Sequence, residues 1–411
     1  MRHVINFLII CGILLILVTG TALSGTVVNV RICDETINGN LLQLKSLLDK
    51  GADPDIRLCL NGMTPLMVAA SFNRVEILKA LLEQGAGVHD TDKNGATALM
   101  LAADKGNVES VKLLLDRGAY INARDSAGRT VLVRVLDIPV KQPDRKHLAE
   151  KVRADNELRG RLAVARFLIE NGADLQRTDN MGRTALAVAV TNGHIEPAKL
   201  LAGMGASVSS ADNNGETVLM AAVSGGQTEL VGFLIAKGAD INAPDDYGTT
   251  ALLLAIEKGN NDMVKALVGK GKGNGVDIQA ADSDGVTPLL MAVDKGNAEA
   301  ARILLDKGAA VDSADDLDRT PLIVAVERND SELAKLLLRK NADINAVDEN
   351  GRTSIIIAAD KGYTDVVKML LARGGAALDA EDDSGETALG TAEKRKFSDI
   401  VGLIRAAKQR T

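Results

Sequence analysis

The stretch GMTPLMVAA, residues 62–70, decides the fold of this chain because it returns at regular intervals. Close copies are GATALMLAA at 95–103, GRTALAVAV at 182–190, GVTPLLMAV at 285–293 and GRTSIIIAA at 351–359. The repeat is marked by ten threonines: Thr64, Thr97, Thr130, Thr184, Thr217, Thr250, Thr287, Thr320, Thr353 and Thr387. Most steps between them are 33 residues, and the exceptions are 54, 37 and 34. A period of this length is typical of a solenoid, in which small similar units stack on one another.

Each threonine is expected to precede a short helix, because its hydroxyl can accept a hydrogen bond from an unpaired backbone N–H of the first turn. A second helix is expected to begin at an acidic residue and to end at a glycine, as between Glu109 and Gly118. The connector that follows has an aspartate three residues before a glycine, as in Asp125 and Gly128. That composition favours a tight turn. The predicted unit is therefore a helix, a second helix and an extended turn.

This unit resembles the ankyrin repeat, which has the same length and opens its first helix with the motif Thr-Pro-Leu-His. The motif appears here as TPLM at 64–67, TALM at 97–100, TVLM at 217–220, TPLL at 287–290 and TPLI at 320–323. Because an apolar residue replaces the family's histidine, we expect hydrophobic contact where the family has a buried chain of hydrogen bonds. The resemblance implies an all-α repeat solenoid of about eleven stacked helix-turn-helix modules with extended turn connectors. It also implies that the chain binds another protein through its concave groove and connector tips.

The composition agrees with thin helical layers that are buried only against their neighbours. Apolar residues make up 46% of the 411-residue chain but aromatic residues only 2%, which is unlike a large enzyme core. Eleven modules, counting a first one at about residues 34–53, account for the chain after residue 24, so we expect no separate catalytic domain within it. The net charge of −7 argues against a nucleic-acid partner.

Residues 1–24 differ in kind from the repeats. Arg2 precedes an apolar run at residues 4–18, and small residues follow at 19–25. This layout predicts a secretory signal peptide that is cleaved after Ser24, with the ankyrin-like repeats at residues 30–411. The alternative is an uncleaved membrane anchor, since the apolar run approaches the length that spans a bilayer. In both cases we expect the repeats outside the cytoplasm. The resemblance to ankyrin repeats, together with such a leader, implies a bacterial periplasm, with tethering at an inner membrane if the leader is not cleaved.

Two cysteines remain after this leader, and both lie near the start of the repeats. Cys59 occupies the connector position that holds aspartate in most later modules, and Cys33 precedes the first expected helix of the first module. Exported proteins retain disulfides, so the pair predicts a Cys33–Cys59 bond that stabilises the terminal module. The alternative is two unpaired, small side chains.

An insertion at residues 139–159 causes the 54-residue step. It contains six Lys or Arg and four Asp or Glu, so it is locally basic in an acidic protein. We expect the second helix of the fourth module to extend backwards from Arg161 into the insertion, with Gly160 as a weak point. The insertion is either a solvated lengthening or a projection that contacts a partner. Its candidate binding residues are Lys141, Arg145, Lys146, His147, Lys151 and Arg153.

A glycine-rich segment, GKGKGNG at 269–275, lengthens a later connector by four residues. A phosphate-binding glycine loop needs a preceding strand and a following helix, whereas this segment follows a helix and enters a turn. We therefore expect a flexible loop here.

Two columns of opposite charge are expected at the ends of the first helices. The candidate binding residues in these columns are Asp104, Lys105, Glu257, Lys258, Asp294, Lys295, Glu327, Arg328, Asp360 and Lys361, and Glu393 with Lys394 continues them in the last module. In the ankyrin family this region borders the groove that holds partners, so the columns are candidates for a partner-binding surface. The alternative is a solvated face whose charges pair with each other, at about 0.2–1 kcal/mol per exposed pair.

The sequence offers little for catalysis. His147 has Asp144, Glu150 and Asp155 near it in the insertion, but no second histidine or cysteine lies at metal-ligand spacing. We expect neither a metal nor another cofactor. An enzyme that works through His147 remains the third and least favoured interpretation, after an exported protein-binding scaffold and a membrane-anchored scaffold of an envelope complex.

Overall fold

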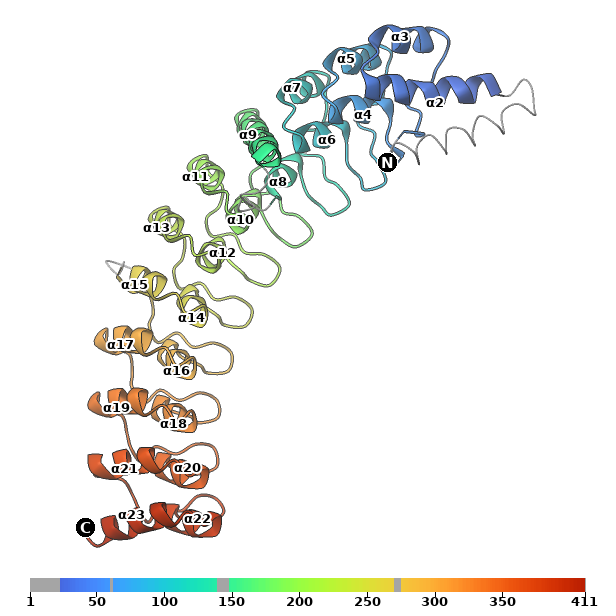
Figure 1. The fold of residues 1–411 in the computed structure, drawn as a ribbon. Coiled ribbons are helices and arrows are strands. Elements are labelled where there is room, and N and C mark those ends of the chain that lie inside the picture. Colours follow the sequence, from blue (N-terminus) through green and yellow to red (C-terminus); the bar gives the residue numbers. More distant parts are fainter. Residues whose placement is uncertain (1–22, 60–61, 139–147, 270–274, 411) are drawn as a thin grey trace. The chain divides into compact units, whose positions relative to one another are not determined.

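The computed structural model describes residues 23–59, 62–138, 148–269 and 275–410. The chain divides after Ser207 into two compact units, which we call the N-terminal unit and the C-terminal unit and describe separately (Figure 1). The described residues of both units form helices joined by extended connectors, with isolated two-residue bridges in place of β-sheets. None of the described helices is both long enough and apolar enough to cross a membrane.

The N-terminal unit contains five pairs of antiparallel helices in its described residues. They are α2 (Leu23–Asn38) with α3 (Leu41–Asp49), α4 (Pro65–Ser71) with α5 (Val75–Glu83), α6 (Ala98–Asp104) with α7 (Val108–Asp116), α8 (Val131–Leu136) with α9 (Leu148–Glu170), and α10 (Ala185–Thr191) with α11 (Ile195–Gly203). Helix α2 begins at Leu23, ahead of residue 30, where we expected the repeats to start. No proline occurs between Leu23 and Asn38 to interrupt the helix.

The C-terminal unit contains six further pairs in its described residues. They are α12 (Val218–Ser224) with α13 (Thr228–Ala236), α14 (Ala251–Glu257) with α15 (Asn261–Gly269), α16 (Pro288–Asp294) with α17 (Ala298–Asp306), α18 (Pro321–Glu327) with α19 (Ser331–Arg339), α20 (Ser354–Lys361) with α21 (Thr364–Arg373), and α22 (Ala388–Arg395) with α23 (Ser398–Lys408). The expected all-α repeat architecture with about eleven helix pairs is therefore confirmed. The segments 270–274 of the glycine loop and 139–147 of the insertion lie outside the described residues.

The first helix of each pair is the more deeply buried one. In α4, every residue from Pro65 to Ala70 is buried, because neighbouring first helices and the second helix of the same pair pack around it. The second helices are less completely buried, as in α19, which buries Leu333, Ala334, Leu336, Leu337 and Leu338 and leaves its other residues partly or fully exposed. The core therefore consists of thin layers of Ala, Val, Leu and Ile, as the aromatic-poor composition indicates.

The threonines begin the first helices as expected. Nine of the ten accept a hydrogen bond from the backbone N–H three residues later, as Thr287 does from Leu290 at 3.3 Å. Thr353 is the exception, since its buried hydroxyl has no hydrogen-bond partner. A threonine at this position therefore fixes the start of a first helix in nearly every module.

Aspartates shape the connectors in the way their spacing predicts. The Oδ1 atom of Asp92 accepts hydrogen bonds from the backbone N–H groups of Asn94 and Ala96, both at 2.8 Å. The N–H of Ser126 then donates to the carbonyl of Asn94 at 2.9 Å, which ties one connector to the next. The same pattern in other modules keeps successive connector tips in register.

Contact between modules combines apolar packing with hydrogen bonds from the residue just before the second helix. Met67 and Met100, which replace the family's histidine, are fully buried. Hydrogen bonds to the preceding module come instead from residues just before the second helices: Asn107 Nδ2 donates to the Ala70 carbonyl at 2.8 Å, and His194 Nε2 lies 2.7 Å from the Ile138 carbonyl. The expected substitution of hydrophobic contact for hydrogen bonding is therefore only partial.

The insertion lengthens α9, as expected, but Gly160 has a different role from the weak point that we predicted. The helix runs through Gly160 without a break. A Cβ atom at this position would lie 2.9 Å from the carbonyl oxygen of Gly106, which has a positive φ of 70° in the turn after α6. Glycine at both positions allows the two backbones to approach closely.

Cys33 on α2 and Cys59 in the first connector are joined by a disulfide, with their Cα atoms 5.3 Å apart. Both side chains are buried. The bond spans a sequence separation of 26 residues that includes α3. It therefore links the two ends of the terminal module, which has a stacking neighbour on one side only.

Replacing both Cys33 and Cys59 by serine is expected to destabilise the first module, by about 3–4 kcal/mol in the chain-entropy model for a loop of this length. Backbone amides of α2 and α3 should then exchange with deuterium faster, while those of α12 and α13 keep their rates. Mass spectrometry of protein isolated without reductant should find the two thiols blocked to alkylation. Two freely alkylated thiols in that sample would contradict the disulfide.

His194 should make stability depend on pH. Burial lowers the pKa of His194, and the nearby charge of Arg161 lowers it further, against the hydrogen bond to Ile138. Between this lowered pKa and the unfolded value of 6.5, the unfolded chain binds the proton and the folded chain does not. Stability should therefore rise with pH across that window and be complete above about pH 6.5.

The His194→Gln variant should lose this rise, whereas His89→Gln should keep it, because His89 is exposed and stacks on Tyr120. Thermal unfolding recorded at half-unit steps between pH 5 and pH 7.5 measures both variants. An unchanged pH dependence in His194→Gln would exclude this role.

Candidate partner-binding surface

The predicted charge columns lie at the ends of the first helices, as the repeat places them. Asp104 and Lys105 close α6 in the N-terminal unit. The other eight residues close α14, α16, α18 and α20 in the C-terminal unit, and we call them the C-terminal face: Glu257, Lys258, Asp294, Lys295, Glu327, Arg328, Asp360 and Lys361. The two sets are described separately, because they belong to different units.

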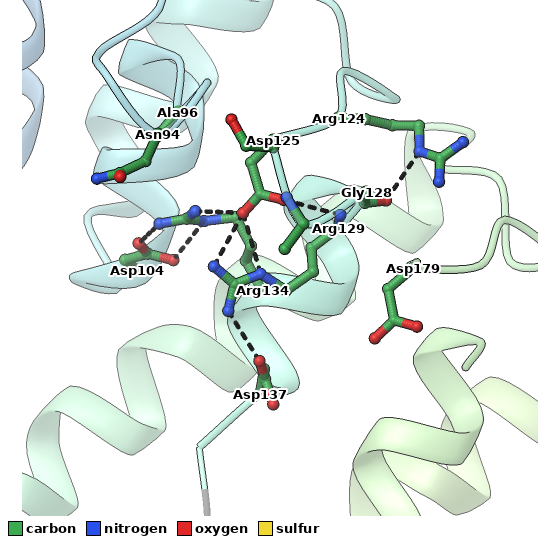
Figure 2. Close-up of polar contacts among 12 residues, drawn as sticks. Asn94, Ala96, Asp104, Arg124, Asp125, Gly128, Arg129, Arg134, Asp137 and Asp179 are labelled. Carbon is green, nitrogen blue, oxygen red and sulfur yellow. Dashed lines mark hydrogen bonds and ion pairs between the residues drawn. The ribbon is translucent and has the colours of Figure 1, made fainter. Parts of the chain in front are cut away.

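Asp104 belongs to a network of charged side chains between α6 and α8 (Figure 2). Arg134 pairs with Asp104 and also with Asp125, whose Oδ2 lies 2.6 Å from Nη1. Arg129 contacts the same Asp125 oxygen through Nε at 3.0 Å and reaches Asp137 through Nη1 at 2.9 Å. Two guanidinium groups are thus shared among three carboxylates.

The burial of this network determines whether its charged groups are available to a partner. The side chains of Asp125 and Arg134 are only 1% and 12% exposed. Burial favours a raised pKa for Asp125, but hydrogen bonds from the Arg129 backbone N–H, Arg134 and the Arg129 side chain outweigh it and hold the pKa below its usual value. Removing one partner from such a network leaves a buried charge uncompensated. Asp104 therefore serves the packing of α6 on α8 rather than offering a free carboxylate.

Three acidic residues of the C-terminal face pair with arginines, mainly across two successive modules. Asp294 lies 3.5 Å from Arg328, and Asp360 lies 2.8 Å from Arg395. Glu327 lies between two arginines, 3.7 Å from Arg319 and 3.8 Å from Arg352. Pairing across the columns therefore occurs, and the residues involved come mainly from successive modules.

Arginines directly before four of the threonines were missed by sequence reasoning. Arg129, Arg183, Arg319 and Arg352 each contact the connector aspartate four residues earlier, namely Asp125, Asp179, Asp315 and Asp348. These four aspartates are buried, whereas connector aspartates without such an arginine, as Asp92 and Asp245, are partly exposed. The recurring Asp-to-Arg spacing of four residues was a signal that could have revealed these pairs.

Four residues of the C-terminal face carry exposed charges. In the described part of the chain, Glu257, Lys258, Lys295 and Lys361 form no ion pair. Glu216 occupies the position before Thr217 that arginine holds in four other modules. Burial, Asp212 and Asp245 raise the pKa of Glu216, and the charge of Lys258 partly offsets this. Because no salt bridge from the described residues occupies them, these charges are candidates for contact with a partner.

The column assignment in the last module was wrong by one residue. Arg395, eight residues after Thr387, reaches Asp360 in the way that Arg328, eight residues after Thr320, reaches Asp294. The basic column therefore continues in Arg395 rather than in Lys394, which contacts Glu386 at 2.9 Å. The preceding connector is one residue longer, as the 34-residue step indicates.

The candidate residues of the insertion are not tested by the structure. Lys141, Arg145, Lys146 and His147 lie outside the described residues. Lys151 and Arg153 lie on α9, but the positions of their side chains are not described.

The described residues contain no cluster of three or more His, Cys, Asp or Glu side chains that could hold a metal ion. A groove of about 540 Å³ between α9 and α11 is lined mainly by apolar residues, and its Lys199 and Glu196 lie 3.6 Å apart. It brings together no nucleophile and base.

Comparison with known proteins agrees with this architecture. A family model described as ankyrin repeats (3 copies) matches residues 33–125, 157–212, 199–282, 272–348 and 328–409. A similar solved structure is the ankyrin repeat domain of Bcl-3, described as a unique member of the IkappaB protein family. It is 30% identical in sequence, with a TM-score of 0.51, and the match covers 55% of this chain and 99% of that one.

A search of curated proteins found no match. The family model nevertheless covers well over half of the chain, and its matched segments coincide with the helix pairs described above. This chain belongs to the ankyrin repeat family.

Proposed function

We propose that this protein is a non-catalytic scaffold that works outside the cytoplasm and binds another protein through its C-terminal face and connector tips. The observation that supports the proposal is a set of exposed charges at the ends of helices that are otherwise almost wholly buried. They are Glu257, Lys258, Lys295 and Lys361, which form no ion pair with the residues that the structure describes. Helices held by buried layers require little ordering on association, so less entropy opposes binding.

Two features support a location outside the cytoplasm. Residues 1–24 have the layout of a signal peptide, and a Cys33–Cys59 disulfide suits an oxidising compartment. The alternative is a membrane-anchored scaffold of an envelope complex, for which the apolar run at residues 4–18 is the supporting feature. In both forms the same surface binds the partner.

Neutralising the exposed charges of the C-terminal face should reduce partner capture at least tenfold. The variant combines Glu257→Gln, Lys258→Gln, Lys295→Gln and Lys361→Gln. A matched control removes one acid and three lysines from the second helices through Glu332→Gln, Lys335→Gln, Lys265→Gln and Lys368→Gln, whose exposed pairs contribute about 0.2–1 kcal/mol each. Quantitative pull-down from the envelope fraction of the source cell, with residues 25–411 as bait, measures both.

Equal capture by both variants and the unchanged bait would exclude the C-terminal face as the binding surface. Deleting residues 139–159 in the same bait tests the insertion separately. Reduced capture with unchanged helicity would assign it a contact, and unchanged capture would make it a solvated lengthening.

The mass of the protein isolated from its source cell should be lower than that of the full sequence by residues 1–24, because a signal peptidase is expected to cut after Ser24. Intact-mass measurement and sequencing of the first residues check this. A full-length protein in the membrane fraction would instead support the anchored form.

A further inference from the structure

Large apolar side chains that are exposed in the C-terminal unit all lie in its connectors. Among the described residues of this unit, they are Tyr247 at 67% exposure, Leu317 at 42% and Val347 at 47%. The helices between these connectors leave no comparable side chain open to solvent. Tyr247 and Leu317 are therefore open to contact with a partner, each in its own connector.

Backbone hydrogen bonds place Tyr247 and Leu317 along one edge. The N–H of Ser283 donates to the Tyr247 carbonyl at 2.8 Å, and the N–H of Asp316 donates to the Asp284 carbonyl at 3.1 Å. The ladder continues from Glu349 to Leu317 at 3.0 Å and from Asp383 to Asn350 at 3.1 Å. We call residues 246–247, 283–284, 316–317, 349–350 and 383–384 the tip edge, which Figure 1 shows as the row of loops preceding α14, α16, α18, α20 and α22.

Each connector of the tip edge also carries an exposed carboxylate, namely Asp246, Asp284, Asp316, Glu349 and Asp383. None of these five forms an ion pair within the described residues. They differ in this respect from Asp315 and Asp348 of the same connectors, which arginines cover. The apolar residues of the edge are thus surrounded by uncompensated negative charge.

The repeat does not require an acidic residue directly after the connector aspartate, because Asn213 and Ser283 of the C-terminal unit also occupy that position. The residues of the N-terminal unit that correspond to Asp246 in their connectors are Lys93, Ser126 and Asn180, none of which is acidic. The fold requires only a backbone N–H at this position, to donate to the preceding connector. The acids of the tip edge are therefore not explained by folding.

We propose that the tip edge binds an extended cationic segment of a partner protein, with a basic residue at every third position. Neighbouring helices pack about 8–10 Å apart, so the connectors that precede successive first helices repeat at about that distance. An extended or polyproline II chain advances about 9–10 Å in three residues, which brings every third side chain to the next connector. Apolar side chains between the basic ones would meet Tyr247 and Leu317.

This inference rests on the proposed function and specifies the partner's chemistry. The negative edge repels the phosphates of nucleic acids and the surface of anionic membranes. A protein segment that carries both cationic and apolar side chains is the occupant that matches both features of the edge.

The test uses a fluorescein-labelled 15-residue peptide with lysine at every third position, one proline in each triplet and two leucines. Fluorescence anisotropy with residues 25–411 should show saturable binding that weakens as salt rises from 50 to 200 mM, because salt screens exposed charges. A peptide of the same composition with its five lysines contiguous should bind at least fivefold more weakly. Equal binding of the two peptides would overturn the proposed spacing.

Two variants with the same loss of charge separate the tip edge from general attraction. Asp246→Asn, Asp316→Asn, Glu349→Gln and Asp383→Asn together should weaken binding at least tenfold. Asp262→Asn, Glu332→Gln, Asp365→Asn and Asp399→Asn, which lie in the first turns of second helices, should change it less than twofold. Circular dichroism must show that both variants stay folded. Equal weakening in both would overturn the proposal.

The variants Tyr247→Ala and Leu317→Ala test the apolar contact of the tip edge. The control variants Tyr120→Ala and Leu42→Ala remove exposed apolar residues of the N-terminal unit. The first pair should weaken peptide binding at least threefold, and the second pair should leave it unchanged.

If the tip-edge charge variant still captures the cellular partner while the C-terminal face variant does not, the tip-edge proposal fails and the proposed function stands.

Discussion

The rest of this structure depends on the hydrogen bonds that a connector aspartate accepts from the backbone N–H groups that follow it. One carboxylate oxygen, as in Asp282, accepts from the N–H groups two and four residues later at 3.0 and 2.9 Å. These bonds fix the turn that brings the next threonine to the start of its helix. They also hold the tip N–H and carbonyl groups where the neighbouring connectors can pair with them. The start of each first helix and the register of the connectors both depend on these two hydrogen bonds.

Charge in this protein serves two different ends. Buried pairs such as Arg134 with Asp125, and Arg319 with Asp315, fasten connectors and first helices together within the modules. Exposed and unpaired groups such as Lys258 and Lys295 contribute nothing comparable to stability. The distinction explains why the predicted charge columns are only partly a candidate binding surface. Asp104, Asp294, Glu327 and Asp360 are held by arginines, and the lysines beside them carry more of the available charge.

The sequence predicted the helix pairs well, because threonine, aspartate and glycine each have a local mechanism at their position in the repeat. Reasoning from single modules failed where contacts join two modules. The contact of Glu327 with Arg352 and the hydrogen bond of Asn107 depend on which residue the neighbouring module presents. The extra residue before Thr387 shifted the last column for a similar reason. The signal peptide and the binding residues of the insertion stay predictions.

The contact between Gly106 and Gly160 limits how the insertion can vary. At residue 160, a side chain of any kind would meet the carbonyl of Gly106, and at residue 106 it would meet the backbone of α9 at 2.7 Å. Residues 148–159 are the part of α9 that precedes this contact in the chain. A larger residue at either glycine would therefore force α9 away from the turn after α6. Natural variants of this protein should keep glycine at both positions, whatever the sequence of their insertion.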